Sequence, residues 1–152
     1  MSGIRTGKAT MVDVTDKAES TRTAAAQAIV QLSEATFKRV SDNTMRKGDV
    51  LTVAQLAGIM GAKRTSELIP LCHPLFLSKV SVDLHLLPLE NSIRIQSEVR
   101  TKGSTGVEME ALTAVSVASL CVYDMCKSIG HEITITDTKL VSKTGGKSDF
   151  ST

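Results

Sequence analysis

Residues 101–127 read TKGSTGVEMEALTAVSVASLCVYDMCK, and we expect this stretch to decide the fold. After a Gly-containing turn it has no Pro and no Gly before Gly130, and apolar residues fill almost every helical face from Ala111 to Cys126. This pattern predicts a helix that spans about 30 Å, roughly the width of a small domain. A surface helix usually has a polar face. Because this one has hardly any, we expect it to be buried by its own domain and by a second copy of the chain.

Four charged residues interrupt this apolar helix: Glu108, Glu110, Asp124 and Lys127. Asp124 and Lys127 are three residues apart, so they share one helical face. Burying a charge is costly unless it is paired or has a function. Two interpretations therefore stay open at this point: a buried ion pair that fixes the helix, or a functional site.

Composition excludes several classes of protein. The chain has 152 residues, 41% of them hydrophobic, which predicts one domain with a real core. A net charge of +2 and 3% aromatic residues argue against binding of single-stranded nucleic acid. We find no run long enough to span a bilayer and no signal peptide. Three cysteines without zinc-site spacing suggest a reducing, cytoplasmic setting.

Strands are predicted where apolar and polar residues alternate or cluster, at residues 11–14, 21–32, 77–87, 93–99 and 133–141. A turn-like stretch from Pro88 to Ser92 joins two of them into a β-hairpin. Residues 143–147, KTGGK, are expected to close the chain as a flexible, basic tail.

Helices are predicted between the first strands. Ser33 is expected to cap a helix over residues 33–40. Asp49 is expected to cap another, whose apolar residues have helical spacing: Val53, Leu56, Ala57 and Met60. A helical turn follows at residues 65–67, and LCHPL at 71–75 predicts a tight turn fixed by Pro. The long helix is expected to end at Gly130.

The predicted order is strand, helices, two strands, helix and strand, which is the split βαβ pattern. We therefore predict an α+β, ferredoxin-like fold with an antiparallel sheet and helices packed on one face. Residues 1–10 are expected to form a flexible N-terminal arm, and residues 11–152 a single domain.

His73 is the histidine most typical of a site, because Pro74 stiffens the turn that carries it. The alternative is a histidine that only satisfies the turn, and this is the interpretation we favour for His85 and His131. Lys143 and Lys147 flank two glycines, where backbone N–H groups could also face an anion.

The sequence argues against three other kinds of site. A P-loop would need Gly where this chain has Val141. A zinc site at Cys72, His73 and Cys126 lacks a fourth ligand and the usual spacing. No Ser lies at a strand-to-helix elbow, which argues against a Ser-His-Asp triad.

Several stretches closely resemble one family, and they are MVDVTDKAE (11–19), KGDV (47–50), AKRTSELIPLCHPL (62–75), TGVEMEALTA (105–114), YDMCK (123–127) and KTGGKS (143–148). The family is that of molybdenum cofactor biosynthesis protein C, whose members are cyclic pyranopterin monophosphate synthases. The resemblance runs from Met11 to Phe150.

The resemblance implies a cytoplasmic lyase, with residues 11–152 as its catalytic domain. The substrate would be (8S)-3′,8-cyclo-7,8-dihydroguanosine 5′-triphosphate, and the products cyclic pyranopterin monophosphate and diphosphate. A homohexamer built as a trimer of dimers is implied, with active sites at the dimer interface. No metal, nucleic acid or membrane partner is expected. No redox cofactor is expected either, because the radical step belongs to the preceding enzyme.

The resemblance also implies roles for individual residues. The catalytic residues would be Asp124, Lys127, Lys47 and Lys143. The substrate-binding residues would be Leu71, Cys72, His73, Glu108, Met109, Glu110, Lys63 and Lys147. Lysines suit a triphosphate, and a Lys–Asp pair suits proton transfer, although the sequence leaves open which lysine is acid and which is base.

Two departures from the family pattern are visible: Ser104 stands where Lys is usual, and Asp149 where Gly is usual. The first would weaken a local anion contact, and the second adds a negative charge to the basic tail. Two other functions stay open. A non-catalytic pterin- or nucleotide-binding module would use the same lysines and His73, whereas a purely structural oligomer would leave Lys127 without a role.

Overall fold

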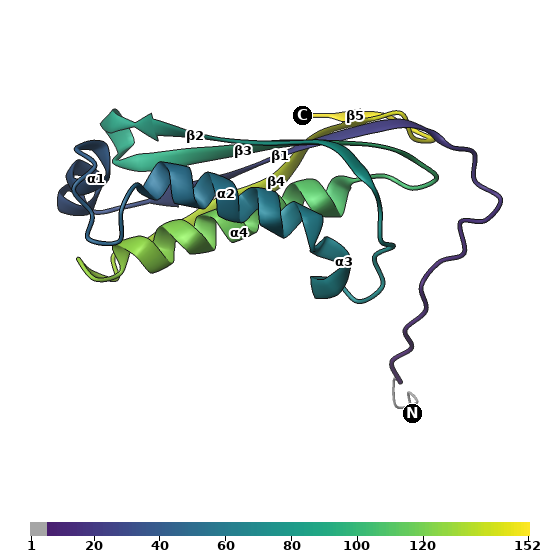
Figure 1. Cartoon of the computed structure of the whole chain (residues 1–152), viewed down its shortest axis with the longest axis horizontal. Coiled ribbons are helices and arrows are strands. Elements are labelled where there is room, and N and C mark those ends of the chain that lie inside the picture. The colour runs from purple at the N-terminus through teal and green to yellow at the C-terminus, as the bar shows by residue number, and fades with distance from the viewer. Residues whose placement is uncertain (1–5) are drawn as a thin grey trace, which may run out of the picture.

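A computed structural model describes residues 6–152 of the chain (Figure 1). Within these residues one antiparallel sheet has the strand order β2-β3-β1-β4-β5. The strands are β1 (Ser20–Gln31), β2 (Leu77–Leu87), β3 (Ser92–Gly103), β4 (Thr134–Thr144) and β5 (Phe150–Ser151). The helices are α1 (Glu34–Ser41), α2 (Val50–Lys63), α3 (Thr65–Leu68) and α4 (Glu108–Cys126), and a 3-10 turn, η1 (Pro88–Glu90), lies between β2 and β3.

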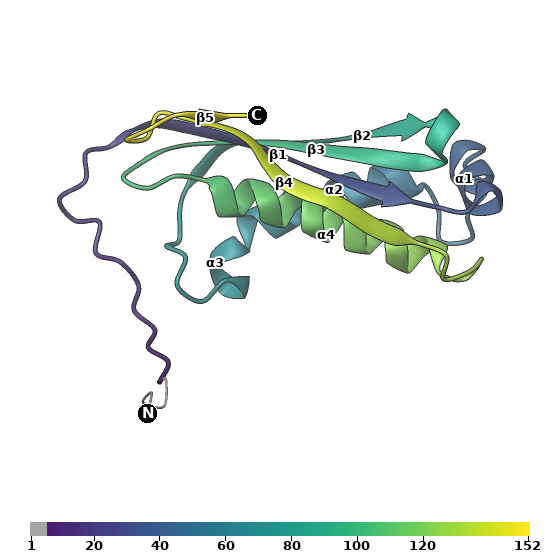
Figure 2. The same ribbon diagram turned by 180° about the vertical axis from the view of Figure 1, so that it is seen from behind.

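Helices α2 and α4 lie side by side under one face of the sheet, and both views show the other face without a helix (Figures 1 and 2). The predicted α+β, ferredoxin-like fold is confirmed, because the first four strands have the order β2-β3-β1-β4 with helices on one side. The predicted β-hairpin is also present, as β2, η1 and β3.

Small residues on β1 allow α4 to lie close to the sheet. Ala24, Ala26, Ala28 and Val30 alternate along the strand, and each is at most 1% exposed. This two-residue period places all four on the face that α4 covers. The alternation of apolar and polar residues that predicted the strand therefore also identifies which side of it faces the core.

Glycine brings the two helices together. A Cβ atom added at Gly58 of α2 would lie 2.9 Å from the carbonyl oxygen of Ala114, and one at Gly61 would lie 2.9 Å from Cβ of Val117. Both distances are too short for a real side chain, so the α2–α4 contact depends on these glycines. The Ser33 and Asp49 caps are confirmed, since their side chains accept the backbone N–H groups of Thr36 and Thr52.

Three boundary predictions were wrong. Residues 11–14 form no strand, because Asp13 turns the chain by accepting the N–H of Thr15 and the segment pairs with no other strand. The long helix ends at Cys126, before Gly130, and Lys127 is its C-cap residue. The end of the chain is not a free tail, because β4 continues to Thr144 and β5 folds back to pair with it.

The predicted apolar positions of α2 do not face the core. Val53, Leu56 and Met60 are 41%, 58% and 45% exposed, whereas Ala54 and Gly58 point inward. Helical spacing alone cannot say which of two apolar sides packs inside. Here the small side packs on α4, and the larger side chains are left on the surface of the chain.

The prediction that no run could span a bilayer needs one correction. Helix α4 is long and apolar enough to cross a membrane by length and composition alone. In the fold, however, it is the core helix that covers β1 and β3. Of the predicted flexible arm over residues 1–10, residues 1–5 lie outside the described residues, and residues 6–10 are exposed and irregular.

Candidate functional site

One cleft lies at the N-terminal end of α4. It has a volume of about 420 Å³, and its lining includes Leu71, Cys72 and His73 from the turn after α3, Glu108 and Met109 from α4, and Val12, Val14 and Lys17 from the segment before β1. Five of the predicted substrate-binding residues therefore share one surface. Because aliphatic side chains dominate the lining, this cleft suits an uncharged ring more than a phosphate chain.

A second, basic hollow adjoins this cleft. It has a volume of about 150 Å³ and is lined by four cationic side chains, Lys17, Arg22, Lys143 and Lys147. Lys17, Thr105, Gly106 and Glu108 line both spaces, so the two are continuous. Four cations against one carboxylate make the hollow suited to a polyphosphate.

Backbone geometry shapes the basic hollow. Gly145 has φ +87°, and a Cβ there would lie 1.9 Å from the carbonyl oxygen of Thr21, so only glycine fits this turn. Arg22 is 8% exposed and donates from Nε to the carbonyl oxygen of Gly103 at 3.0 Å. Asp149 accepts the Gly145 N–H at 3.2 Å, so its negative charge closes the turn that carries Lys147.

Sequence reasoning missed Lys17 and Arg22. A signal was present for Arg22, because its even-numbered position on β1 shares the core-facing register with Ala24 and Ala26. A guanidinium on that side of a strand needs a special environment. For Lys17, the one signal in the sequence was that it lies in the stretch at residues 11–19 that resembles the family.

Glu110 lies behind the cleft and does not line it. The side chain is 3% exposed, Cys72 Sγ donates to its Oε2 at 3.7 Å, and its Oε1 has no hydrogen-bond partner. Burial raises the pKa of the Glu110 carboxyl. Burial, with a smaller effect from the charge of Glu110, also raises the pKa of the Cys72 thiol to about 11. The Cys72 thiol therefore stays protonated at neutral pH, and the Glu110 carboxyl holds its proton to a higher pH than an exposed glutamate does.

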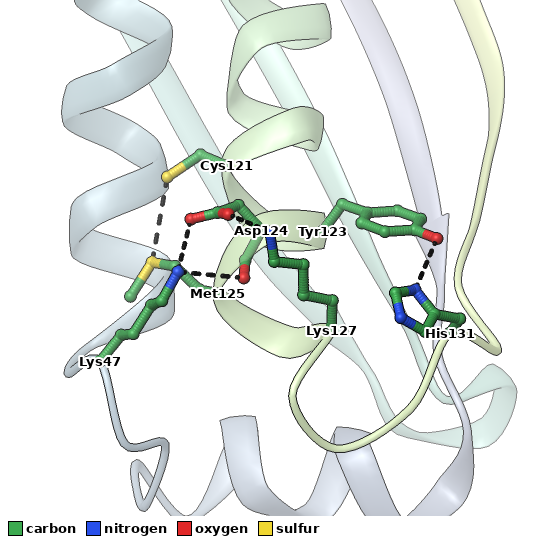
Figure 3. A network of polar contacts seen from close by, with 7 residues as sticks. All are labelled: Lys47, Cys121, Tyr123, Asp124, Met125, Lys127 and His131. Atoms are coloured by element: carbon green, nitrogen blue, oxygen red, sulfur yellow. Dashed lines mark hydrogen bonds and ion pairs between the residues drawn. The ribbon is translucent and has the colours of Figure 1, made fainter.

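A separate cluster lies at the C-terminal end of α4, where Asp124 stands between two lysines (Figure 3). Lys47 Nζ is 2.8 Å from Asp124 Oδ2, and Lys127 Nζ is 2.9 Å from Oδ1. Hydrogen bonds from Lys47 and Lys127, and then their charges, lower the pKa of the Asp124 carboxyl to about 2. All three side chains are about half exposed, at 51%, 53% and 49% for Lys47, Asp124 and Lys127. The interpretation of a buried Asp124–Lys127 ion pair is therefore wrong for the single chain.

Two other residues lie apart from this cluster: Tyr123, which belongs to the quoted stretch at 123–127, and Lys63, a predicted substrate-binding residue. Figure 3 shows Tyr123 pointing away from Asp124 towards His131, with 3.3 Å between its hydroxyl and His131 Nδ1. Lys63, at the end of α2, lines a different hollow with Phe76 and Lys79. The structure thus brings Lys63 to neither cluster. Among residues 6–152, no group of three or more His, Cys, Asp or Glu side chains could hold a metal ion.

The two clusters lie at opposite ends of one helix. Glu110 is in the first turn of the 19-residue α4, and Asp124 is in its last turn. Fourteen residues at 1.5 Å per residue separate them by ~21 Å along the axis. A single chain therefore does not bring Asp124, Lys47 and Lys127 to His73, Lys143 and Lys147.

The chain is similar to proteins of one family. The model of the MoaC family matches residues 11–146. Molybdenum cofactor biosynthesis protein 1 of Drosophila melanogaster is 61% identical over 144 residues, which are 95% of this chain and 26% of that protein. The chain thus spans about a quarter of the length of that relative.

Two bacterial relatives are matched over most of their length. Both are named cyclic pyranopterin monophosphate synthase. The protein of Heliobacterium modesticaldum is 56% identical over 142 residues, which cover 93% of this chain and 89% of that protein. The protein of Syntrophomonas wolfei is 55% identical over 142 residues, with 93% and 90% covered.

Proposed function

Because the chain belongs to the MoaC family, we propose that it is a cyclic pyranopterin monophosphate synthase, a lyase of molybdenum cofactor biosynthesis. Its substrate is (8S)-3′,8-cyclo-7,8-dihydroguanosine 5′-triphosphate, and its products are cyclic pyranopterin monophosphate and diphosphate. The observation that carries the proposal is the family match over residues 11–146, which contains the Asp124 cluster and His73. Residues 11–152 act as one catalytic domain, and the enzyme works in the cytoplasm.

The products define what the site must do. A cyclic monophosphate forms from a triphosphate when a sugar hydroxyl attacks the α-phosphorus, its proton leaves to a base, and the bond to the β-phosphate breaks with release of diphosphate. Four cationic side chains line the basic hollow, so this hollow holds the phosphates and the leaving diphosphate. The adjoining aliphatic cleft holds the rings, next to His73.

The proton transfers belong to the Asp124 cluster. With a pKa of about 2, the Asp124 carboxylate stays ionised at neutral pH, and it contacts the ammonium groups of Lys47 and Lys127 together. The carboxylate orients both lysines, which exchange protons with the rearranging rings as general acid and base. Lys143 is the fourth catalytic residue, and it acts from the basic hollow that holds the phosphates.

A complete site takes residues from two copies of the chain. The two ends of α4 are ~21 Å apart within one chain. They form one site when the Asp124 end of α4 in one copy lies against the His73 end of α4 in another copy. Five large apolar residues on the helical side of the chain are well exposed and offer a contact surface: Val53, Leu56, Met60, Leu68 and Leu120. The assembly we propose is a homohexamer, a trimer of dimers with sites at the dimer interface.

Two measurements test these proposals. Light scattering should give about 97 kDa, six copies of the 16.2 kDa chain, and a 16.2 kDa particle at micromolar concentration would contradict the assembly. The purified protein, incubated with the cyclic triphosphate, should release one diphosphate for each pterin formed. Tight binding of that substrate without any product would instead identify a non-catalytic binding module.

A further inference from the structure

The segment before β1 reaches His73 through its backbone. The carbonyl oxygen of Val12 lies 2.6 Å from His73 Nε2. The Val12 side chain is 68% exposed, so hydrophobic packing does not explain why the segment is there. In both views this segment leaves the end of the sheet and descends on the same side as the loop after α3 (Figures 1 and 2). A short hydrogen bond to a ring nitrogen is thus the specific contact between this segment and the cleft.

Residues 12–19, which we call the N-terminal strap, are fixed at several points. Asp13 Oδ1 accepts the Thr15 N–H at 2.9 Å, and the Val14 carbonyl accepts the Lys17 N–H at 3.0 Å. The Ala18 carbonyl accepts a hydrogen bond from Arg22 at 3.3 Å, next to the start of β1. Two local turns and an anchor on the sheet therefore hold Val12 in place.

The strap also brings a charge near the ring. Hydrogen bonds from Thr15 lower the pKa of the Asp13 carboxyl, and the charge of His73 lowers it further by a smaller amount. The Asp13 carboxylate therefore lies within electrostatic range of His73. Because the strap contacts the histidine at one end and lines the cleft with Val14 and Lys17, it forms a wall of the cleft and a support for its histidine.

A carbonyl oxygen can only accept a hydrogen bond, so the contact assigns the proton of the neutral imidazole to Nε2. Nδ1 is then the nitrogen that keeps a free lone pair. A lone pair accepts N–H or O–H groups, which the bicyclic base and the sugar carry. Fully ionised phosphates have no such hydrogen, and the cations that suit them lie in the adjoining basic hollow.

We propose that the N-terminal strap is a positioning element for His73: the Val12 carbonyl fixes the Nε2–H tautomer, so that Nδ1 accepts an N–H or O–H donor of the substrate's rings. This inference rests on the proposed function, since it takes the rings to lie in the His73 cleft. In this arrangement His73 binds the base and sugar, and the lysines and Arg22 bind the triphosphate.

The tautomer can be measured without any turnover. The protein contains three histidines, and ¹⁵N-histidine labelling with His73→Gln as the assignment control identifies the His73 signals. At pH 8, above the ordinary histidine pKa of about 6.5, intact protein should show the Nε2–H tautomer alone. A predominant Nδ1–H tautomer, or averaging between the two, would overturn the proposal.

Two variants then test the strap. Deletion of residues 2–14 removes the carbonyl, and Asp13→Ala removes the turn that shapes the strap while keeping the chain length. Deletion of residues 2–9 is the matched control that keeps Val12. We expect both test variants, with unchanged circular dichroism, to show mixed tautomers and a KM that rises ~2- to 12-fold, the range of one hydrogen bond, with kcat changed much less.

The control deletion should behave as the intact protein does. An unchanged His73 tautomer and KM in a folded Asp13→Ala protein would contradict the positioning role, even if the deletion of residues 2–14 failed to fold. Absence of turnover in the intact protein would refute the proposed function instead, while the tautomer would still test the strap.

Discussion

The buried Glu110 should control how the stability of this protein depends on pH. Its side chain is 3% exposed, and one carboxyl oxygen lacks a hydrogen-bond partner. Burial raises its pKa above the ordinary value of 4.5, so the folded state binds this proton more tightly than the unfolded state does. The stabilisation is fully present below pH 4.5 and is lost as the pH rises through the raised folded pKa.

Glu110→Gln keeps the shape of the side chain and cannot ionise. For one proton, linkage gives a maximal slope of about 1.4 kcal/mol per pH unit. We therefore expect the free energy of unfolding of the wild-type protein to fall relative to the variant as the pH rises from 4.5, with a slope of up to that size. The slope is largest between pH 4.5 and the raised folded pKa, and it returns to zero above the folded pKa, where both states have lost this proton.

The assay is urea unfolding between pH 4 and pH 8.5 at one protein concentration. Circular dichroism is the suitable probe, because the chain has no Trp and one Tyr. Glu132→Gln, at an exposed position after α4, removes the same charge without a buried carboxyl and is the matched control. Wild-type and Glu110→Gln curves that stay parallel across this range would refute the argument that burial raises the pKa of Glu110.

Three further outcomes are expected. Asp124→Asn should leave circular dichroism and particle mass unchanged and lower kcat by at least ~100-fold, the usual scale for a lost acid–base group; near-normal turnover would remove Asp124 from the mechanism. Lys147→Ala should raise KM, with a defect that shrinks at high salt, because it contributes a screened charge to the basic hollow; a salt-independent defect would point to packing instead. Gly61→Ala should destabilise by about 1–3 kcal/mol, because its methyl group would meet Val117 at 2.9 Å, while Gly130→Ala meets nothing within 4 Å and should be neutral in the same melting experiment.

Helices and strands with a long, regular pattern of apolar residues could be predicted from the sequence. β1 was predicted because Ala24, Ala26 and Ala28 alternate over a whole strand, and α4 because its apolar run is long and uninterrupted. The short segment 11–14 has apolar residues as well, but a strand also needs a neighbour to pair with. Pairing is a property of the whole fold, and a four-residue pattern does not contain it.

Sequence reasoning named residues that the structure brings together, but it did not give their arrangement. The family resemblance identified Lys47 and Asp124, which are 77 residues apart and lie 2.8 Å from each other in the structure. Neither pattern nor resemblance placed Glu110 behind the cleft, because burial of one helical face depends on the turn that packs over it. Val12 gave no sequence signal either, since its contact with His73 uses a backbone carbonyl that every residue has.

Co-expression of two inactive variants tests most directly whether one site is built from the two ends of α4 in different copies. Lys143→Ala chains, which lose a catalytic lysine beside the His73 cleft, and Asp124→Asn chains are co-expressed with different tags, and particles that carry both tags are purified. With random mixing at equal amounts, about a quarter of the interface sites combine an intact Asp124 end with an intact His73 end. We predict that these mixed particles regain about that fraction of wild-type turnover, while each variant alone stays inactive. Mixed particles that remain as inactive as the two separate variants would contradict it.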